Sequence, residues 1–588
     1  MNKTSRYRVG LTMIILSMIM LSIIILAACI PSSPTPQVTA PASPSSPTEE
    51  SVEIATPVAQ QETEPVPSAS PTALPETAQK FLPWWNDTVF YEIFVRSFMD
   101  SDGDGIGDVN GIISMLDYLN DGDPSTTDDL GVTGIWLMPI QPSPSYHGYD
   151  VTDYYGINPD YGTIDDFKNL MQAAHQRGIK IIIDLVYNHT SSQHPWFIAS
   201  RDNDPAYRDW YVWSDTNPGF LGPWGQQVWY QTDSGYYYAI FWSEMPDLNL
   251  ASAEVTAEMN EVTRFWLEEM GVDGFRLDAA RHYIEQGRGQ ENTPATHAWL
   301  QSFFKYYKGL NPQAFTVGEI WTSTDQILEY IGDEVDIAFE FDLALSFLTA
   351  ARGPITASLN EQMEEVLKNY PEGQYAVFLT NHDQDRVMSQ LDGDEARSKL
   401  AATLMLTSPG VPFIYYGEEI GMTGVKPDED IRLPMKWSDK TGVGFTSGTP
   451  WRAPSKDQPE WNVLDSMEDP ASLLSHYRNL IQLRNQHAAL RTGKAVLVET
   501  DTARLYAMLR YNDEEAFLIL VNVHPKPLTL DLYSLSLPAG LPFKGPVQAI
   551  SVLDQTPVEA PQITTLGGFQ NYQPLTEIPA ASSYIIHL

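Results

Sequence analysis

Acidic side chains that could serve as a nucleophile and as a proton donor end separate apolar segments of the chain. Arg276 and Asp278 are two positions apart, so a strand would place both on one face. A guanidinium beside a carboxylate favours the ionised form, which a carboxylate nucleophile requires. Glu319 ends the next apolar segment and suits general acid work, and Asp383 follows His382 at the end of a later one. Each group alone could form a structural ion pair. Three converging acids, however, repel one another and destabilise the fold, and such clusters are typical of active sites.

A ring of parallel strands would bring these residues together. From Trp84 to about Gly493, short apolar runs alternate with amphipathic helical stretches, which is the sequence form of repeated β–α units. We expect an α/β fold, a (β/α)₈ TIM barrel, which places active sites at the C-terminal ends of its strands. The expected strands are 88–98, 134–140, 179–189, 271–280, 314–321, 336–345, 375–383 and 411–421.

An aromatic-rich excursion lies between the third and fourth expected strands, at about 190–250. It predicts a small inserted domain beside the catalytic cleft. Flat aromatic faces suit the apolar faces of sugar rings, but a compact insertion also needs aromatic side chains for its own core. Both interpretations stay open here, and no single stacking residue is assigned.

A third part of the chain follows the last expected barrel helix, at 473–489. Short β-like runs such as 516–523 and 583–588 predict a C-terminal β-sandwich. We therefore expect the barrel in 81–189 and 251–493, the inserted domain in 190–250 and the β-sandwich in 494–588.

The N-terminal segment has the composition of an export signal followed by a spacer. Basic residues precede an apolar run that ends in Leu-Ala-Ala-Cys, and this Cys29 is the single cysteine of the sequence. The segment resembles the lipobox of bacterial lipoproteins, although an uncleaved signal anchor would begin in the same way. We expect a signal peptide at 1–28, lipidation of Cys29 and a disordered Pro/Ser/Thr-rich linker at 29–80. The protein would then be held at a membrane outside the cytoplasm, at the cell surface or in the periplasm.

Length and charge exclude some classes of partner. The chain has 588 residues, more than the roughly 100–200 residues of one ordinary domain, so we expect several domains. With 35 Lys+Arg against 76 Asp+Glu, its net charge of -41 would repel a phosphate backbone. We expect no nucleic-acid partner, and we expect a monomer.

Four ordered motifs resemble those of glycoside hydrolase family 13, the α-amylase family, and the resemblance runs from about Phe81 through the C-terminal domain. They read Asp-Leu-Val-Tyr-Asn-His at 184–189, Gly-Phe-Arg-Leu-Asp-Ala-Ala-Arg-His at 274–282, Gly-Glu-Ile-Trp at 318–321 and Phe-Leu-Thr-Asn-His-Asp at 378–383.

The resemblance implies a retaining hydrolysis of α-glucosidic bonds, with carboxylates about 5–5.5 Å apart and no organic cofactor. Asp278 would be the nucleophile, Glu319 the general acid/base, and Asp383 the third acid, which holds sugar hydroxyls. Tyr149, in Tyr-His-Gly-Tyr-Asp at 146–150, would place its ring under the cleaved sugar. For His147 and His189 a structural role is the alternative. The expected substrate-binding residues are Tyr149, His147, His189, Arg276, His282, His382 and Arg386.

An acidic loop after the first expected strand has the spacing of a calcium site. Side-chain oxygens stand at positions 1, 3, 5 and 9 of the loop, a backbone carbonyl at 7 and glycine at 6, as in an EF-hand loop. Position 12 is glycine instead of the bidentate glutamate, so we expect no EF-hand domain. Family members related to oligo-1,6-glucosidase carry a similar loop, and a solvated acidic turn is the alternative. The expected Ca²⁺ ligands are Asp100, Asp102, Asp104, Ile106 and Asp108. Asn188 matches a ligand of a second calcium in many α-amylases, but the insertion offers no assignable partner ligand.

Specificity within the family depends on a short motif. Met-Pro-Asp-Leu-Asn at 245–249 lies between the forms of oligo-1,6-glucosidases and neopullulanases, as in an intermediate α-amylase group. We expect an α-amylase that acts internally on starch and maltooligosaccharides. The alternatives are an exo-acting α-glucosidase or oligo-1,6-glucosidase, a cyclomaltodextrinase or neopullulanase, and a 4-α-glucanotransferase. A non-catalytic glucan-binding lipoprotein is an alternative of another class.

Overall fold

The computed structural model describes residues 82–553 and 555–588. Cys29, the signal peptide expected at 1–28 and the linker expected at 29–80 lie outside the described residues and stay predictions. Within the described part of the chain, no helix combines the length and the apolar character needed to cross a bilayer.

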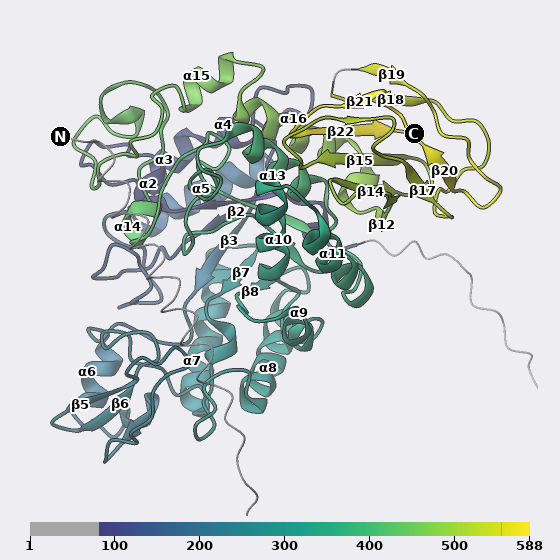
Figure 1. Cartoon of the computed structure of the whole chain (residues 1–588). Helices are drawn as coiled ribbons and strands as arrows, with labels where there is room; N and C mark the ends of the chain where they lie inside the picture. The colour runs from purple at the N-terminus through teal and green to yellow at the C-terminus, as the bar shows by residue number, and fades with distance from the viewer. Residues whose placement is uncertain (1–81, 554) are drawn as a thin grey trace, which may run out of the picture. The chain divides into compact units, whose positions relative to one another are not determined.

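An eight-stranded parallel sheet has the order β10-β11-β1-β2-β3-β7-β8-β9. Figure 1 labels four of its neighbouring strands, β2, β3, β7 and β8. A parallel bridge between Phe339 and Ala376 joins the two ends of this order, so the sheet closes into a barrel. The predicted (β/α)₈ fold is therefore confirmed. The strands are β1 (Phe90–Ile93), β2 (Gly134–Leu137), β3 (Lys180–Leu185), β7 (Gly274–Leu277), β8 (Phe315–Gly318), β9 (Ile337–Ala338), β10 (Ala376–Val377) and β11 (Val411–Tyr415).

Helices alternate with the barrel strands along the chain. The longer ones are α5 (Ile164–Gln176), α7 (Ala253–Arg264), α8 (Pro294–Leu310), α10 (Phe341–Arg352), α11 (Ala357–Asn369), α13 (Glu395–Thr407) and α16 (Leu473–Gln486). Short helices occupy the connections: α2 (Val95–Phe98), α3 (Val109–Ser114), α4 (Leu116–Leu119), α9 (Thr324–Ile327), α12 (Val387–Gln390), α14 (Asp428–Ile431), α15 (Val463–Glu468) and α17 (Ala488–Arg491).

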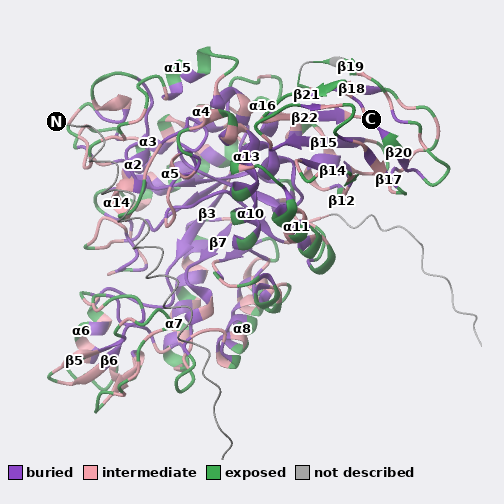
Figure 2. Cartoon of the chain, in the orientation of Figure 1, coloured by how far each residue is buried: buried purple, intermediate pink, exposed green. Residues whose placement is uncertain are grey.

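Aromatic rings fill the barrel interior. Phe90 of β1 stacks on Phe413 of β11, with ring centroids 4.5 Å apart, and on Phe315 of β8, at 5.5 Å. The strand residues are buried almost throughout, as the purple sheet in Figure 2 shows. Strands that are covered on both faces have continuous apolar sequences, so the apolar runs predicted where these strands lie.

The expected strands are longer than the observed ones: β10 has two residues of the expected 375–383, and residues 95–98 of the expected 88–98 form helix α2. The expected strand 336–345 was largely wrong. β9 has two residues, and helix α10 occupies the second half of the expected strand 336–345. Phe339, Phe341, Leu343 and Leu345 alternate with other residues and imitate a strand, yet Leu345 is exposed. The buried residues of this segment instead include Leu343 and Phe347, which are four positions apart as on one face of a helix.

The insertion after β3 is a small domain with its own sheet. It contains helix α6 (Pro195–Arg201) and three antiparallel strands in the order β4-β6-β5, namely β4 (Trp213–Ser214), β6 (Gly235–Tyr238) and β5 (Trp229–Thr232). Phe197 packs against Trp213 and Tyr237 with ring centroids 5.9 and 5.0 Å away, so many of the aromatic side chains serve the core. An antiparallel bridge pairs His189 with Asp247, which places the two ends of the insertion side by side.

The C-terminal region consists of antiparallel sheets, as the predicted β-sandwich requires. A six-stranded sheet has the order β12-β14-β15-β22-β18-β19, and smaller sheets have the orders β13-β17-β20 and β16-β21. Leu518 and Leu520 of the large sheet share a buried cluster with Leu535 and Phe569 of a small one. The strands are β12 (Lys494–Leu497), β13 (Glu499–Thr500), β14 (Leu505–Tyr511), β15 (Ala516–Asn522), β16 (Leu528–Thr529), β17 (Leu535–Leu537), β18 (Ala549–Ser551), β19 (Thr556–Val558), β20 (Phe569–Tyr572), β21 (Glu577–Ile578) and β22 (Ser582–His587).

Candidate active site

One buried arginine at the end of β7 pairs with three carboxylates. Nη1 of Arg276 lies 2.8 Å from Asp184 Oδ1 and 2.7 Å from Asp278 Oδ1, and its Nη2 lies 2.7 Å from Glu319 Oε2. Asp184 stands near the end of β3, Asp278 directly after β7 and Glu319 directly after β8, so three adjacent strands supply the acids. Glu319 Oε2 also accepts a hydrogen bond from the Ala279 amide, at 3.0 Å. The barrel thus brings Arg276, Asp278 and Glu319 together as expected.

Asp278 is less strongly favoured as an anion than the sequence suggested. Burial raises its pKa, the Arg276 guanidinium opposes that change, and the charges of Glu319 and Asp184 add to it. The expectation treated Arg276 and Asp278 as an isolated pair, whereas one positive charge is shared by three carboxylates. The pKa of this carboxyl group therefore lies well above its usual range.

Two cations hold the third acid, Asp383. Nε2 of His382 lies 3.2 Å from Asp383 Oδ2, and Nη2 of Arg432 lies 2.8 Å from Asp383 Oδ1. Burial acts to raise the pKa of Asp383, but His382, Arg432 and Arg276 hold it well below its usual range. Asp383 is therefore firmly anionic.

His382 is a charged histidine among neutral ones. Its Nδ1 lies 2.5 Å from Glu92 Oε1, and its Nε2 faces Asp383. A carboxylate can only accept, so each ring nitrogen must carry a hydrogen. Burial lowers the pKa of His382, but Asp383 and Glu92 outweigh it and raise that pKa to about 9. By contrast, burial lowers the pKa of His189 to about 3 and that of His282 to about 4, and it also lowers the pKa of His147.

Tyr149 connects the two acid groups. Its hydroxyl lies 2.6 Å from His382 Nε2 and donates to Asp184 Oδ2 at 3.1 Å. Its ring stacks on the His382 ring, with centroids 5.5 Å apart. The tyrosine is thereby fixed in orientation between Asp184 and His382.

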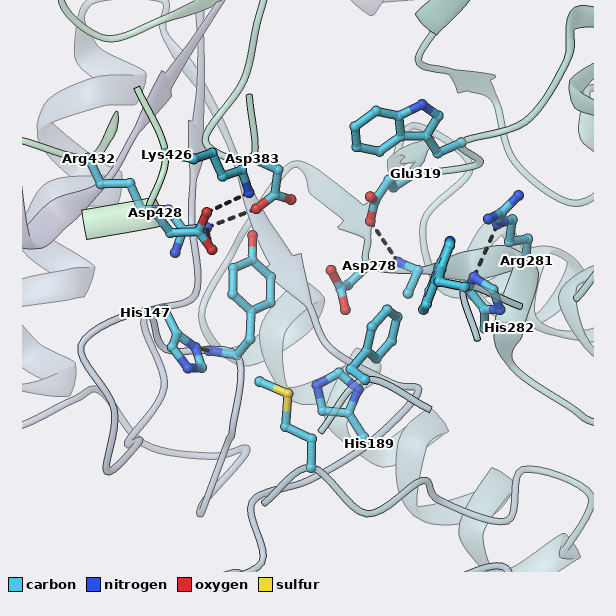
Figure 3. A pocket seen from close by; sticks show the side chains of 16 residues that line it. His147, His189, Asp278, Arg281, His282, Glu319, Asp383, Lys426, Asp428 and Arg432 are labelled. Carbon is cyan, nitrogen blue, oxygen red and sulfur yellow. Dashed lines mark hydrogen bonds and ion pairs between the residues drawn. The ribbon is translucent and has the colours of Figure 1, made fainter. Parts of the chain in front are cut away.

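These groups surround one cavity of about 760 Å³. In Figure 3, Asp383, Arg432, Asp428 and Lys426 lie to one side of Asp278 and Glu319, while Arg281 and His282 lie to the other. Arg276 and His382 lie beneath the cavity and act on it through the acids they contact. The predicted residues that line the cavity are Tyr149, His147, His189, Asp278, His282, Glu319 and Asp383.

Comparison with known proteins identifies the family to which this site belongs. The model of the α-amylase catalytic domain matches residues 92–493. The chain belongs to the α-amylase family. It is thus a member of glycoside hydrolase family 13, the family indicated by its four motifs.

Individual relatives of this α-amylase-family enzyme include more than one named activity. Alpha-amylase 3 of Dictyoglomus thermophilum is 43% identical over 450 residues, which cover 75% of this chain and 86% of that protein. The oligo-1,6-glucosidase of Parageobacillus thermoglucosidasius is 34% identical over 521 residues, which cover 75% of this chain and 91% of that one. The crystal structure of an α-amylase from H. orenii matches with a TM-score of 0.74 and 40% identity, over 85% of this chain and 99% of that one.

Arg386 lies outside the cavity of this family member. Its Nε donates to the Ile431 carbonyl at 2.8 Å and its Nη1 to the Tyr416 carbonyl at 2.7 Å. The buried guanidinium also lies over the rings of Tyr415 and Tyr416, at 4.4 and 4.7 Å. The prediction that Arg386 binds substrate is therefore not supported, because the cation is used to fix the backbone that follows β11.

Several residues in or around the cavity of the enzyme were missed by sequence reasoning. Arg432 and Glu92 belong to no catalytic motif, and only their contacts with Asp383 and His382 show their position. Asp184 stands first in its motif and Trp321 last in another, so those motifs contained the signal. The cavity residues not assigned beforehand are Trp224, Phe241, Met245, Ala279, Arg281, Trp321, Lys426, Asp428 and Arg432.

The acidic loop after β1 gathers three of its predicted ligands. Carboxylate oxygens of Asp100, Asp102 and Asp108 lie within 4.8 Å of one another. Burial acts to raise the pKa of Asp100, but hydrogen bonds from Thr446 and from loop amides lower it. Asp104 stands outside this group, and its Oδ1 accepts from the Ile106 amide at 2.7 Å. Clustered carboxylate oxygens on a tight loop fit Ca²⁺, which prefers oxygen ligands.

Proposed function

We propose that this enzyme hydrolyses internal α-1,4-glucosidic bonds in starch and maltooligosaccharides, with retention of the anomeric configuration. The observation that carries the proposal is the convergence of Asp278 and Glu319 on Arg276, beside an anionic Asp383, in one cavity. The cavity continues past the acids to the aromatic side chains Trp224 and Trp321. Identity of 43% and 40% to proteins named α-amylase supports the same substrate class.

In the first displacement Asp278 and Glu319, two of the three acids paired with Arg276, act together. The Asp278 carboxylate attacks the anomeric carbon of the sugar held over Tyr149, and the bond to the glycosidic oxygen breaks. Glu319 gives its proton to that oxygen, so the leaving chain departs as an alcohol and a glycosyl ester with Asp278 remains. Arg276 Nη2 is in place to stabilise the carboxylate that forms on Glu319.

In the second displacement water replaces the leaving chain. The Glu319 carboxylate removes a proton from water, the water oxygen attacks the anomeric carbon, and the ester bond to Asp278 breaks. Two inversions at one carbon restore the α configuration. Asp383, held in place by the His382 imidazolium, would bind sugar hydroxyls while the ring is flattened, and its negative charge would stabilise the positive charge of the transition state.

Oligo-1,6-glucosidase activity is the second candidate, and one feature of the cavity favours it. Lys426 Nζ lies 2.5 Å from Asp428 Oδ1, and Arg432 Nη2 lies 3.6 Å from Asp428 Oδ2. This charged group lines the end of the cavity beyond Asp383. A closed wall there would leave room for a chain end alone, as an exo-acting enzyme requires.

Starch digestion separates these activities. Viscosity and product size are followed together, with Glu319→Gln as the inactive control. Internal cleavage should collapse viscosity while few bonds have been cut and should yield mixed maltooligosaccharides. Early release of glucose with viscosity preserved would favour the second candidate. Starch that is bound but left intact would indicate a non-catalytic glucan-binding protein.

We also propose that Ca²⁺ binds Asp100, Asp102 and Asp108 and stabilises the fold. A ligand that binds only the native state adds about 2.7 kcal/mol at one hundred times its Kd, which is several degrees of melting temperature. Chelation should therefore lower the melting temperature of the wild type and leave Asp100→Asn almost unchanged, with Asp123→Asn, in another acidic loop, as the control. An equal response of all three proteins, with metal removal verified, would contradict the site.

Membrane attachment through a lipid on Cys29 is proposed from the sequence alone. Several acyl chains on one residue provide stable anchoring, and the Pro/Ser/Thr-rich linker would give the catalytic domain reach. Cys29→Ser should release or mislocalise the protein in cell fractionation. A variant that stays membrane-bound with its N-terminal segment intact would favour a signal anchor.

A further inference from the structure

Trp224 and Trp242 of the insertion are exposed, whereas most aromatic side chains around them are packed. Trp224 is 56% exposed, whereas Trp229 is 8% exposed within the core of the same domain. Exposure alone is common at protein surfaces. Trp224 differs because its exposed ring lines the cavity that contains Asp278 and Glu319.

Aromatic neighbours orient the Trp224 ring. It stacks on Phe241 with centroids 5.7 Å apart and planes inclined by 29°, and its edge meets His282 at 5.5 Å. Phe241 in turn meets His189, also at 5.5 Å. Phe241, His282 and His189 line the cavity too, so the indole belongs to a continuous ring surface beside the catalytic acids.

The loop that carries Trp224 is held in place by hydrogen bonds. An antiparallel bridge joins Leu221 to Gln227, and the Gly222 amide donates to the Gln226 carbonyl at 2.8 Å. The Gln226 side chain accepts from the Trp224 amide at 3.0 Å and donates to the Ile240 carbonyl at 2.9 Å. The indole is therefore presented to solvent by a fixed backbone.

Gln290 ties this loop to the segment that follows the nucleophile. Its Nε2 donates to the Leu221 carbonyl at 3.0 Å, and its Oε1 accepts from the Tyr238 hydroxyl at 2.8 Å. The Gln290 carbonyl lies 2.9 Å from Nδ1 of His282, four residues after Asp278. The position of Trp224 is thus coupled to the barrel and not only to the insertion.

The position of Trp224 assigns it to the leaving side of the scissile bond. Asp383 and Arg432 lie on one side of Asp278 and Glu319 in Figure 3, whereas His282, the ring neighbour of Trp224, lies on the other. In the proposed mechanism the sugar that forms the ester lies against Tyr149 and Asp383, which line the cavity. The sugar that leaves must then sit beyond Glu319, on the side of Trp224.

We propose that Trp224 is a specificity-determining residue that stacks on a glucosyl ring of the leaving, or acceptor, chain. Phe241 supports the indole, and Gln226 and Gln290 are positioning residues for its loop. This proposal rests on the proposed α-glucan hydrolysis. It explains the exposed ring, because the apolar face of a glucose unit would cover it during catalysis.

Two probes separate the role of Trp224 from the chemistry of the acids. Maltoheptaose has sugar units on both sides of the cleaved bond, whereas α-maltosyl fluoride has fluoride as its leaving group and no sugar on that side. Trp224→Ala should lower kcat/KM for maltoheptaose by about tenfold, the value of one aromatic stacking contact of about 1.4 kcal/mol. It should leave hydrolysis of α-maltosyl fluoride within about twofold of wild type. Trp224→Phe should restore part of the loss.

Trp242→Ala is the matched control, because Trp242 is 50% exposed in the same insertion but does not line the cavity. It should leave both reactions unchanged. Melting temperatures of all variants show whether the insertion stays folded. If Trp224→Ala unfolds, the rates of Trp224→Phe on the two probes provide the test instead.

The outcomes distinguish this proposal from the proposed function. Equal loss on both probes, or a maltoheptaose rate like that of Trp242→Ala, would overturn the role of Trp224 while the hydrolase proposal stands. A wild type that cleaves neither probe would refute the proposed function and this proposal with it.

With α-maltosyl fluoride as donor and maltotriose as acceptor, the share of transfer product should also fall in Trp224→Ala.

Discussion

The two sides of the cavity are built in different ways. On the charged side, Asp278 and Glu319 directly follow β7 and β8, and Asp383 lies on the segment after β10. Asp278 and Glu319 are ion-paired with buried Arg276, and Asp383 with buried His382. The aromatic side, with Trp224 and Phe241, stands on loops of the insertion and is exposed. Groups that perform bond chemistry require fixed positions, which a closed parallel sheet supplies. Groups that select the substrate can stand on loops, which tolerate replacement.

The two sides of the cavity also differ in the interactions on which they depend. The charged side contains a guanidinium shared by three carboxylates and a buried imidazolium, so we expect its function to depend on pH. The aromatic side depends on contact area and on the position of a ring. Substitutions on the charged side should therefore change the rate and its pH dependence, whereas those on the aromatic side should change substrate preference.

The largest expected effect comes from removal of the carboxylates that we propose act in catalysis. Asp278→Asn and Glu319→Gln should each lower kcat on starch by at least about 10³-fold, because each loses a chemical role at nearly constant volume. The melting temperature should stay equal or rise, since like-charge repulsion around Arg276 is relieved. Near-normal turnover of either variant would contradict the assigned roles.

A smaller effect is expected from Glu92, which never meets the substrate in the proposed mechanism. Glu92→Gln keeps an oxygen that accepts from His382 Nδ1 but removes the negative charge. His382 should then lose its proton at lower pH, so the alkaline limb of kcat/KM should move down by about one pH unit. The measurement is the pH profile of starch hydrolysis, and an unchanged alkaline limb would show that His382 is not the titrating group.

The same substitution has a consequence for stability. The pKa of His382 is raised to about 9 in the folded protein, above an unfolded value of about 6.5. Its protonation therefore contributes stability that is fully present below pH about 6.5 and is lost as the pH rises through about 9. Thermal melts across this window should fall less steeply for Glu92→Gln than for the wild type. Parallel curves would refute this linkage.

The smallest effect is expected at Trp321, on the barrel part of the aromatic lining. Its exposed ring stacks on Phe341 with centroids 4.6 Å apart and planes inclined by 7°, directly beside Glu319. Trp321→Ala should raise KM for maltoheptaose by about threefold with little change in kcat, since it removes contact area and no charge. A large fall in kcat with KM unchanged would instead indicate that Trp321 positions Glu319.

Motif spacing predicted the acids of the charged side well, because the period of a strand and the order of the strands determine where these side chains lie. Asp278 and Glu319 each follow an apolar strand, so a closed parallel sheet brings them together. Arg432 could not be found in this way, because it reaches Asp383 from a loop after β11. The sharing of Arg276 among three carboxylates also depends on side-chain directions that a linear pattern does not contain.

For the aromatic side, the sequence predicted only that the insertion is rich in aromatic residues, and not which of them line the cavity. The sequence showed that 190–250 is rich in aromatic residues, but both a packed core and a sugar-binding surface have that composition. What separates Trp229 from Trp224 is the turn at Gly222–Gln227, held by the side chain of Gln226. Such local hydrogen bonds leave no periodic signal in the sequence.

The bridge between His189 and Asp247 has a consequence for how such an enzyme can diverge. Because the insertion leaves and rejoins the barrel at neighbouring residues, one compact module can be exchanged for another without moving the strands on either side. Evolution or protein engineering could therefore exchange the surface that we propose binds the acceptor chain and leave the acidic residues of the barrel in place.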